Sequence, residues 1–376
     1  MILKNLVLPT LRLIFLPLAF VALVSSCDRN SQPIKIGMSI NLSGRGGVTG
    51  EHIRDGAMLA VDEVNKNGGI NGRPLYLLVR DDENSDEGIR KADESLVKEG
   101  VVAIIGHSYS SNTIKAYPYI TSSGTLMLTA YTATTSLSGK DDLFLRSSID
   151  CNLYGIKTAA LLAEKNVMAV SFLMDMNNAD FVNDYVEQVQ KNYQGGVTTV
   201  QVKSKEKVNW DKVANDLMAN NAQAIVMLTE STMTAMAAQE LKSRNYNGAI
   251  IATPWAQSPE LIRIGGPATE GISIITFIDP DNRRPEYLKF SENLQRYFGK
   301  PATARSARAY EMINMLAQAL GTCKNITANE LKAELLKGQY NSILGPVSFD
   351  RFGDVQRPVY EIVLKNGRFT NAGEIY

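Results

Sequence analysis

The chain has 376 residues, and its 39 Lys+Arg balance 39 Asp+Glu, so the formal charge is zero. That balance gives no reason to expect the basic face of a nucleic-acid-binding protein, and 44% hydrophobic with 21% charged residues excludes wholesale disorder. Two histidines and three cysteines leave little material for a zinc site or a catalytic triad, so we expect no metal and no cofactor. The length predicts two domains.

Residues 1–26 are predicted to be a lipoprotein signal peptide. Lys4 and Arg12 accompany a mostly apolar run, Leu13–Val24, that is shorter than the ~20 residues of a membrane span but fits the core of a secretory signal. The run ends in Val24-Ser25-Ser26-Cys27, which resembles a bacterial lipobox. Cys27 would then be lipidated, and residues 27–33 would form a tether. The alternative is an ordinary signal peptide with an incidental cysteine.

The residue after Cys27 indicates where in the cell the lipoprotein would be located. Asp28 resembles the signal that keeps lipoproteins in the inner membrane of enteric bacteria. We therefore expect the protein on the periplasmic face of the inner membrane, or on the cell surface in a bacterium with one membrane. An oxidising compartment permits a disulfide between Cys151 and Cys323, but the sequence cannot show that the two approach each other. We favour two buried free thiols.

From Ile34 onward, short β-rich runs alternate with amphipathic stretches. Helical spacing of apolar residues predicts helices at Ile53–Asn65, Glu87–Lys98 and Ser111–Ser122. Mostly apolar strands separated by helices indicate an α/β fold with two parallel sheets, each covered on both faces. Such sheets bind ligands beyond the carboxyl ends of their strands. The predicted strands are Ile34–Ile40, Leu75–Arg80, Val101–Gly106, Leu126–Ala130, Val167–Met174, Ala222–Thr229, Gly248–Thr253 and Gly271–Phe277.

Several motifs occur in an order and spacing that are specific together, although each is weak alone. They are Gly56-Ala57-Met58-Leu59-Ala60-Val61-Asp62-Glu63-Val64-Asn65, Gly68-Gly69-Ile70-Asn71-Gly72, Asp81-Asp82, Ile105-Gly106-His107, Ser258-Pro259-Glu260-Leu261, Glu270-Gly271, Leu344-Gly345-Pro346-Val347-Ser348-Phe349-Asp350 and Gly353-Asp354. This set closely resembles the type I periplasmic binding proteins, typified by the Leu/Ile/Val-binding protein of branched-chain amino-acid ABC transporters.

The resemblance implies two doubly wound parallel-sheet lobes that are joined by three crossovers and close on a ligand. Placing the crossovers by the matching segments puts residues 34–149 and 279–343 in lobe 1. Residues 150–278 and 344–376 then form lobe 2.

The resemblance also implies where lobe 1 would hold a ligand. Ser110 falls on the family serine that binds the ligand carboxylate, although it could instead be the N-cap of the following helix. Tyr109 and Tyr131 could be pocket walls or plain packing residues. The candidates in the two loops are Ser108, Tyr109, Ser110, Tyr131, Thr132 and Ala133.

Lobe 2 departs from the family pattern at the contacts to the ligand ammonium. No acid occurs at Thr253–Trp255, Ala133 replaces a threonine, and Asn178-Ala179 stands where the family has a tyrosine. We therefore expect a ligand other than plain Leu, Ile or Val. Glu230 either replaces the missing acid or is a solvated loop residue, and the further candidates are Asn178, Asp180 and Trp255.

The function that the resemblance implies is a monomeric solute-binding lipoprotein. It would deliver an amino acid, or a related small polar or carboxylate ligand, to an inner-membrane ABC permease by hinge closure. The alternative is a sensory protein of the same fold that signals to a membrane receptor. An enzyme is disfavoured because the sequence has no nucleophile–base pair, metal cluster or dinucleotide fingerprint.

Overall fold

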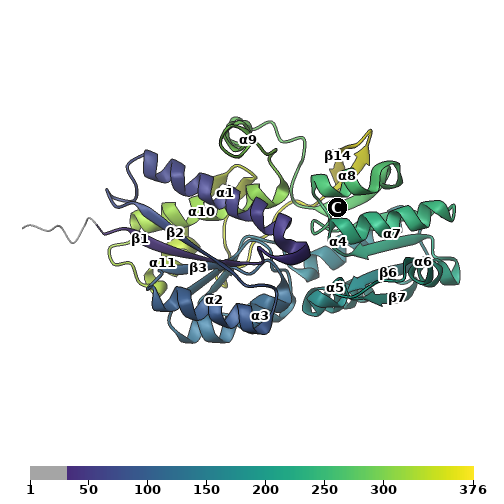
Figure 1. Cartoon of the computed structure of the whole chain (residues 1–376), viewed down its shortest axis with the longest axis horizontal. Coiled ribbons are helices and arrows are strands. Elements are labelled where there is room, and N and C mark those ends of the chain that lie inside the picture. Colours follow the sequence, from purple (N-terminus) through teal and green to yellow (C-terminus); the bar gives the residue numbers. More distant parts are fainter. Residues whose placement is uncertain (1–31) are drawn as a thin grey trace, which may run out of the picture.

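The computed structural model describes residues 32–376, which fold into two α/β lobes lying end to end along the long axis of the molecule (Figure 1). The predicted signal peptide and Cys27 lie outside the described residues. Within residues 32–376, none of the helices combines the length and the apolar character needed to cross a membrane.

The first lobe is built on a five-stranded parallel sheet with the order β2-β1-β3-β4-β5. Its strands are β1 (Ile34–Ile40), β2 (Leu75–Asp81), β3 (Ala103–Gly106), β4 (Leu126–Thr129) and β5 (Phe144–Arg146). Apolar side chains alternate between its faces, so one face packs on α1 and α10 and the other on α2 and α3 (Figure 1). The helices of this lobe are α1 (Gly47–Lys66), α2 (Asp86–Lys98), α3 (Ser110–Ser122), α9 (Pro285–Phe298), α10 (Ala304–Thr322) and α11 (Ala328–Lys337).

The second lobe is built on a seven-stranded sheet with the order β14-β13-β10-β9-β8-β6-β7, in which β13 runs antiparallel to both of its neighbours, β10 and β14, and the other pairs are parallel. Its strands are β6 (Ala169–Asp175), β7 (Gly196–Val202), β8 (Ala224–Leu228), β9 (Ala249–Ala252), β10 (Ser273–Thr276), β13 (Tyr360–Lys365) and β14 (Arg368–Glu374). One face is covered by α4 and α5 and the other by α6, α7 and α8. These helices are α4 (Cys151–Glu164), α5 (Ala179–Asn192), α6 (Trp210–Met218), α7 (Ser231–Ser243) and α8 (Pro259–Gly265).

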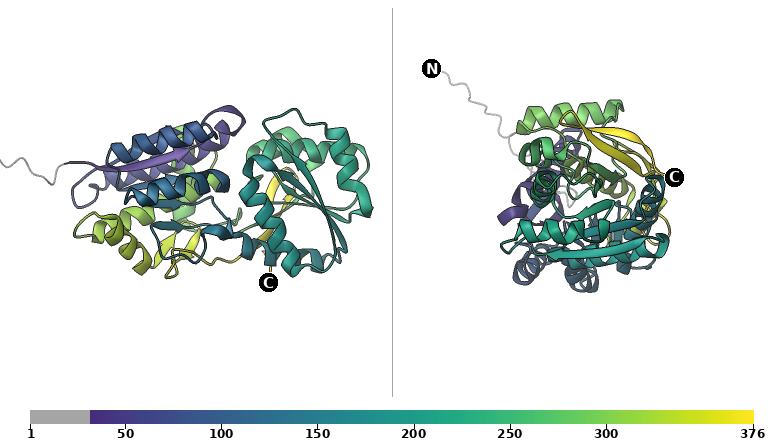
Figure 2. Two further views of the ribbon diagram at one scale, coloured as in Figure 1. Left: turned by 90° about the horizontal axis from the view of Figure 1, so that it is seen from below. Right: turned by 90° about the vertical axis from the view of Figure 1, so that its right-hand side faces the viewer.

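The chain crosses between the lobes three times: after β5, after β10 and before β13. Figure 2 shows these crossings as the thin connection between the two halves. The third crossing comes later than expected. Val347, Phe349 and Val355 are packed in the core of the first lobe, and the hairpin of β11 (Tyr340–Ser342) and β12 (Gly345–Val347) precedes them. Residues 344–355 were expected in lobe 2, and this packing corrects that boundary.

The predicted strands agree with the observed ones to within two residues at either end. β5, β7 and the strands from β11 to β14 were not predicted, because they are short, edge or antiparallel strands with weak apolar runs. Helix α1 begins at Gly47, earlier than the predicted helix start at Ile53. Cys151 and Cys323 are both free thiols, as favoured, although only Cys151 is fully buried.

Candidate functional site

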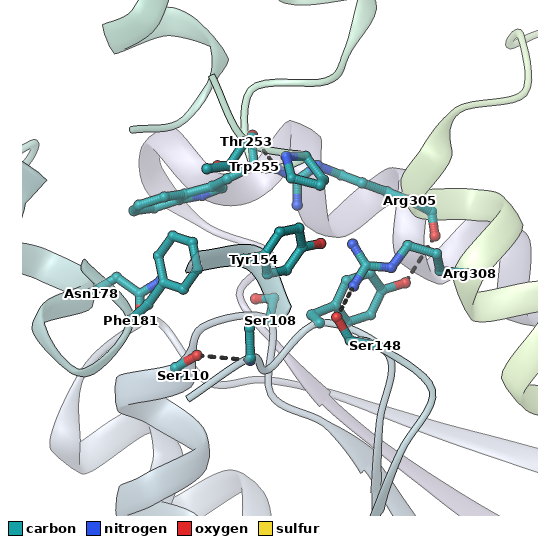
Figure 3. A pocket seen from close by; sticks show the side chains of 13 residues that line it. Ser108, Ser110, Ser148, Tyr154, Asn178, Phe181, Thr253, Trp255, Arg305 and Arg308 are labelled. Carbon is teal, nitrogen blue, oxygen red and sulfur yellow. Dashed lines mark hydrogen bonds between the residues drawn. The ribbon is translucent and has the colours of Figure 1, made fainter. Parts of the chain in front are cut away.

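A pocket lies between the lobes, at the carboxyl ends of strands from both sheets (Figure 3). In the first lobe, the loop after β3 contributes Ser108 and Ser110, and the loop after β4 contributes Tyr131 and Ala133. These four predicted residues therefore come together. Ser148, in the first crossing, lines the same pocket.

Ser110 is the first residue of α3, and the N-cap position belongs to Tyr109. The Ser110 side chain does not cap the helix; its Oγ accepts a hydrogen bond from the Ala133 N–H at 3.2 Å. The alternative interpretation of Ser110 as an N-cap is therefore wrong. Because the hydroxyl oxygen accepts this bond, its hydrogen is left to donate into the pocket.

Thr132 and Tyr109 do not line the pocket but support it. The Thr132 hydroxyl is buried and pairs with Thr113 Oγ1 at 2.5 Å, which ties the loop after β4 to α3. The Tyr109 ring packs edge-on against Trp255 of the second lobe, with centroids 5.6 Å apart. Burial raises the Tyr109 pKa to about 12, so this phenol stays neutral.

The fully buried His107, at the start of the loop after β3, is held by two carboxylates. His107 Nδ1 lies 2.6 Å from Asp82 Oδ2, and Nε2 lies 3.2 Å from Asp93 Oδ2. Burial alone would lower the pKa of His107, but the two carboxylates raise it from 6.5 to about 10. Burial would raise the pKa of Asp82, yet the hydrogen bond from His107 lowers it. Both shifts favour the charged network.

This network predicts a pH dependence of stability. The folded-state pKa of His107 is above its unfolded value, so its contribution is complete below pH 6.5 and is lost as the pH rises toward about 10. We expect the free energy of unfolding to fall by on the order of 3 kcal/mol between pH 6.5 and 9. The check is urea denaturation of the wild type and of His107→Asn at both pH values. An equal fall in the variant would contradict the assignment.

The second lobe supplies the aromatic wall of the pocket. Trp255 follows β9, Phe181 lies in the first turn of α5, and Tyr154 lies on α4; all three rings line the pocket (Figure 3). The rings of Phe181 and Trp255 meet edge to face with centroids 6.0 Å apart. Thr253 adds a buried hydroxyl that has no hydrogen-bond partner among residues 32–376. This side of the pocket can cover an apolar ligand body.

Direct hydrogen bonds between the lobes show that the molecule is closed. The Ser111 N–H donates to Asn178 Oδ1 at 3.1 Å, and the Asp180 N–H donates to Ser111 Oγ at the same distance. Thr135 Oγ1 donates to Asp184 Oδ1 at 2.9 Å. Asn178 thus serves closure as well as lining the pocket.

The two predicted acids of the second lobe do not reach the pocket. The Asp180 side chain is exposed to solvent. Glu230 is the N-cap of α7, where its carboxylate accepts hydrogen bonds from the Thr232 N–H at 2.7 Å and the Met233 N–H at 2.9 Å. Glu230 is therefore neither a free solvated glutamate nor placed to replace the missing ammonium partner.

Two arginines from α10 reach the pocket, and the sequence did not predict either of them. Arg305 is 4% exposed and donates through Nη2 to the Trp255 carbonyl at 2.6 Å. Arg308 is 6% exposed, donates through Nη2 to the Ala130 carbonyl and to Ser148 Oγ, and lies over the Tyr131 ring at 4.8 Å. Burial lowers the pKa of both arginines, but guanidinium groups remain charged in proteins.

Arg305 and Arg308 form no ion pair with a carboxylate in the part of the chain that the structure describes. Within residues 32–376, none of the residues lining the pocket is Asp or Glu. Other buried arginines are paired: Arg146 Nε lies 2.7 Å from Asp354 Oδ1, and Arg357 Nη2 lies 2.6 Å from Glu311 Oε2. An unpaired buried charge is costly, so its retention at two adjacent pocket positions points to an anionic ligand.

The polar atoms left without partners around the pocket are all able to donate. They are the hydroxyls of Ser108 and Thr253 and the Nε atoms of Arg305 and Arg308. A carboxylate, which only accepts hydrogen bonds, satisfies such a set. An ammonium group, which only donates, could use the two hydroxyl oxygens as acceptors but would leave both Nε atoms without a partner.

A pattern in the sequence could have revealed the arginines. Arg305 and Arg308 share a face of the helix with Met312 and Met315, because residues three and four apart align. Two basic residues on the apolar face of an otherwise buried helix indicate a polar cavity at that end of it. Ser148, Tyr154 and Phe181 gave no comparable signal, since only the tertiary fold brings them to the pocket.

Two lobes, three crossings and a pocket between the lobes define a bilobal α/β solute-binding protein. A family model described as periplasmic binding protein matches residues 33–368. The chain belongs to this family, as a type I member with an extracytoplasmic location, and it is a binding protein and not an enzyme.

Named relatives share its length and fold. The chain is 25% identical to the Leu/Ile/Val-binding protein homolog 1 of Brucella suis, covering 92% of this chain and 94% of the relative. It superposes on LivJ of Streptococcus pneumoniae in complex with isoleucine with a TM-score of 0.82 at 19% identity, covering 91% and 99% of the two chains. A solute-binding protein of R. palustris in complex with benzoate gives a TM-score of 0.81 at 15% identity, covering 91% and 96%.

Proposed function

We propose that this protein is the lipid-anchored binding component of an ABC importer and that its ligand is a small organic carboxylate without an α-ammonium group. The observation that carries the proposal is the pair of buried, unpaired arginines in a pocket with no acidic lining residue. Relatives of this fold support both kinds of ligand, since one holds isoleucine and another holds benzoate. The chemistry of this pocket favours the second kind.

The mechanism follows from the positions of the contacts. The first lobe offers Ser110 and the arginines of α10, and the second lobe offers Thr253 and the aromatic wall. A carboxylate bound to the first lobe neutralises buried positive charge and contacts the second lobe only when the cleft closes. Closure is therefore favoured by the ligand through its differential contacts with the two states. A permease could then recognise the closed, loaded protein.

Isothermal titration calorimetry tests the ligand class. Isoleucine, threonine, benzoate, 4-hydroxybenzoate and small aliphatic acids are titrated into the mature chain at neutral pH. We expect binding among the acids that lack an amino group and at least tenfold weaker binding of the amino acids. Tighter binding of an amino acid than of every such acid would contradict the proposal. Uptake of the bound acid by cells with and without the gene then separates transport from sensing.

Ser110→Ala tests the lobe 1 contact. If the hydroxyl donates to the ligand carboxylate, the variant should bind about 1.5–3 kcal/mol more weakly, the range for hydrogen bonds to charged groups. Its stability without ligand should change little. Glu230→Gln is the control, since that carboxylate caps α7 and should leave the affinity within about twofold. Normal affinity in Ser110→Ala would remove this residue from the site.

Cys27→Ser tests the anchor, which rests on the lipobox alone. The parent should fractionate with membranes and the variant should be released into the soluble fraction. The same variant must still bind ligand, which shows that only the anchor was lost. Equal membrane association of both proteins would contradict lipidation at Cys27.

A further inference from the structure

We propose that the ligand is a dicarboxylate, with one carboxylate held by Arg305 and Arg308 and the other by the hydroxyls of Ser108 and Ser110 beside the N-terminus of α3. This inference rests on the proposed function and deepens it from a carboxylate to a dianion. It follows from the charge in the closed pocket and from the separation of its donors into two groups.

The charge of the pocket requires two negative groups. Arg305 and Arg308 each bring a positive charge into a site from which the closed lobes exclude most water. Two acids whose charges act on Arg305 are engaged elsewhere: Glu230 caps α7, and Glu260 Oε1 lies 3.7 Å from His52 Nε2. A monocarboxylate would leave one buried charge uncompensated, whereas a dianion leaves none.

The first group of donors comes from α10. Residues 305 and 308 lie three positions apart on one face, so both guanidinium groups enter the pocket from the same side. Arg308 is fixed by Ser148 Oγ at 3.0 Å, and Arg305 is fixed by the Trp255 carbonyl at 2.6 Å. These contacts use Nη2 of each group, and within the described part of the chain neither Nε atom has a hydrogen-bond partner. Two preorganised guanidinium groups can therefore share one carboxylate.

The second group of donors lies on a different wall of the pocket, where Figure 3 places Ser108 and Ser110 below the aromatic rings. Ser108 Oγ is buried without a partner, and Ser110 keeps its hydroxyl hydrogen because Oγ accepts from Ala133. The N-terminus of the 13-residue helix α3 also attracts an anion. Since Asn178 already accepts the Ser111 N–H, the two hydroxyls are the groups left for the ligand.

The space between the two donor groups is bordered by Tyr154, Phe181 and Trp255 (Figure 3). Aromatic side chains cover apolar surface well and make no demand for a charged partner. The ligand body between its carboxylates is thus expected to be a short apolar chain or a ring.

The test compares each dicarboxylate with its own monoamide, which has nearly the same size and one negative charge fewer. Calorimetry at pH 7.5 uses the linear dicarboxylates of four to seven carbons and the three benzenedicarboxylates, each beside its monoamide, with benzoate as the single-charge reference. We expect one dicarboxylate to bind at least tenfold more tightly than its monoamide and than benzoate, in line with about 10- to 150-fold for a hydrogen bond to a charged group.

Variants place the two carboxylates. In Arg305→Gln, the ratio of dicarboxylate to monoamide affinity should fall at least fivefold. The variant lacks one positive charge of the pocket, so the second negative charge of the dicarboxylate no longer has a charge to neutralise. In the control Arg90→Gln, on the exposed face of α2, the ratio should not change. A purely structural role of Arg305 would alter stability but leave the ratio as it is.

The outcomes separate this inference from the proposed function. Benzoate or a monoamide that binds as tightly as the best dicarboxylate overturns the dianion and leaves a carboxylate-binding protein. If no dicarboxylate binds measurably at millimolar concentration, the dianion is likewise overturned. An amino acid that binds more tightly than all of these acids overturns both.

Discussion

Replacing Glu311 by alanine is expected to lower the free energy of unfolding by about 3–5 kcal/mol, the cost of leaving a buried charge unpaired. Glu311 lies on α10 and is 1% exposed; its carboxylate accepts from Arg357 Nη1 at 3.1 Å and Nη2 at 2.6 Å, and also from the Ser342 hydroxyl. Since Arg357 belongs to the third crossing, the pair fixes a hinge segment to the first lobe. Urea denaturation measures the change.

The matched control is the double variant Glu311→Leu, Arg357→Met. It removes both charges at once and fills much of the same volume, so we expect most of the lost stability to return. A double variant as unstable as the single one would show that packing, and not the unpaired guanidinium, sets the cost.

Arg308→Met is expected to change ligand binding and stability in opposite directions. Binding of the carboxylate ligand should weaken by about 1.5–3 kcal/mol or more, because a charged donor is lost. The free energy of unfolding of the unliganded protein should stay the same or rise. The variant removes an uncompensated buried charge, and the methionine still packs on Tyr131 and Phe277.

The measurement is calorimetry with the best carboxylate, together with urea denaturation of the unliganded protein. A marked loss of stability with unchanged affinity would mean that Arg308 holds the hinge and does not bind the ligand. Arg146→Met is the comparison: that arginine is paired with Asp354, so its loss should destabilise the protein without this compensation.

The fold could be predicted from the sequence because its signals are local. Buried parallel strands such as β4 and β8 are almost entirely apolar runs, and helices such as α2 show one apolar face. The segment after Ile343 was placed in the wrong lobe because its packing depends on Val347, Phe349 and Val355 meeting the core of the first lobe. The local sequence around these three residues does not predict that contact.

The candidate site was predicted only where it follows strand ends. The family resemblance named Ser108, Ser110, Tyr131 and Ala133, which lie in converging loops after parallel strands of the first lobe. Asn178 and Trp255 were named from the matching positions of the second lobe, which also follow strand ends. The same kind of loop also contains three predicted residues whose side chains turn elsewhere. Thr132 joins a buried hydroxyl network, Asp180 points to solvent, and Glu230 caps a helix. The arginines were missed because they reach the pocket from the helix α10 and not from a loop after a strand.

Identification of the molecule that the protein carries through purification tests the central claim most directly. The mature chain is purified without added ligand, native mass spectrometry gives the mass of the bound species, and denaturation followed by small-molecule mass spectrometry identifies it. The account predicts an organic acid with no amino group, released in stoichiometric amount by the wild type and lost from Arg308→Met. Recovery of leucine, isoleucine, valine or another α-amino acid, bound equally by both proteins, would contradict it.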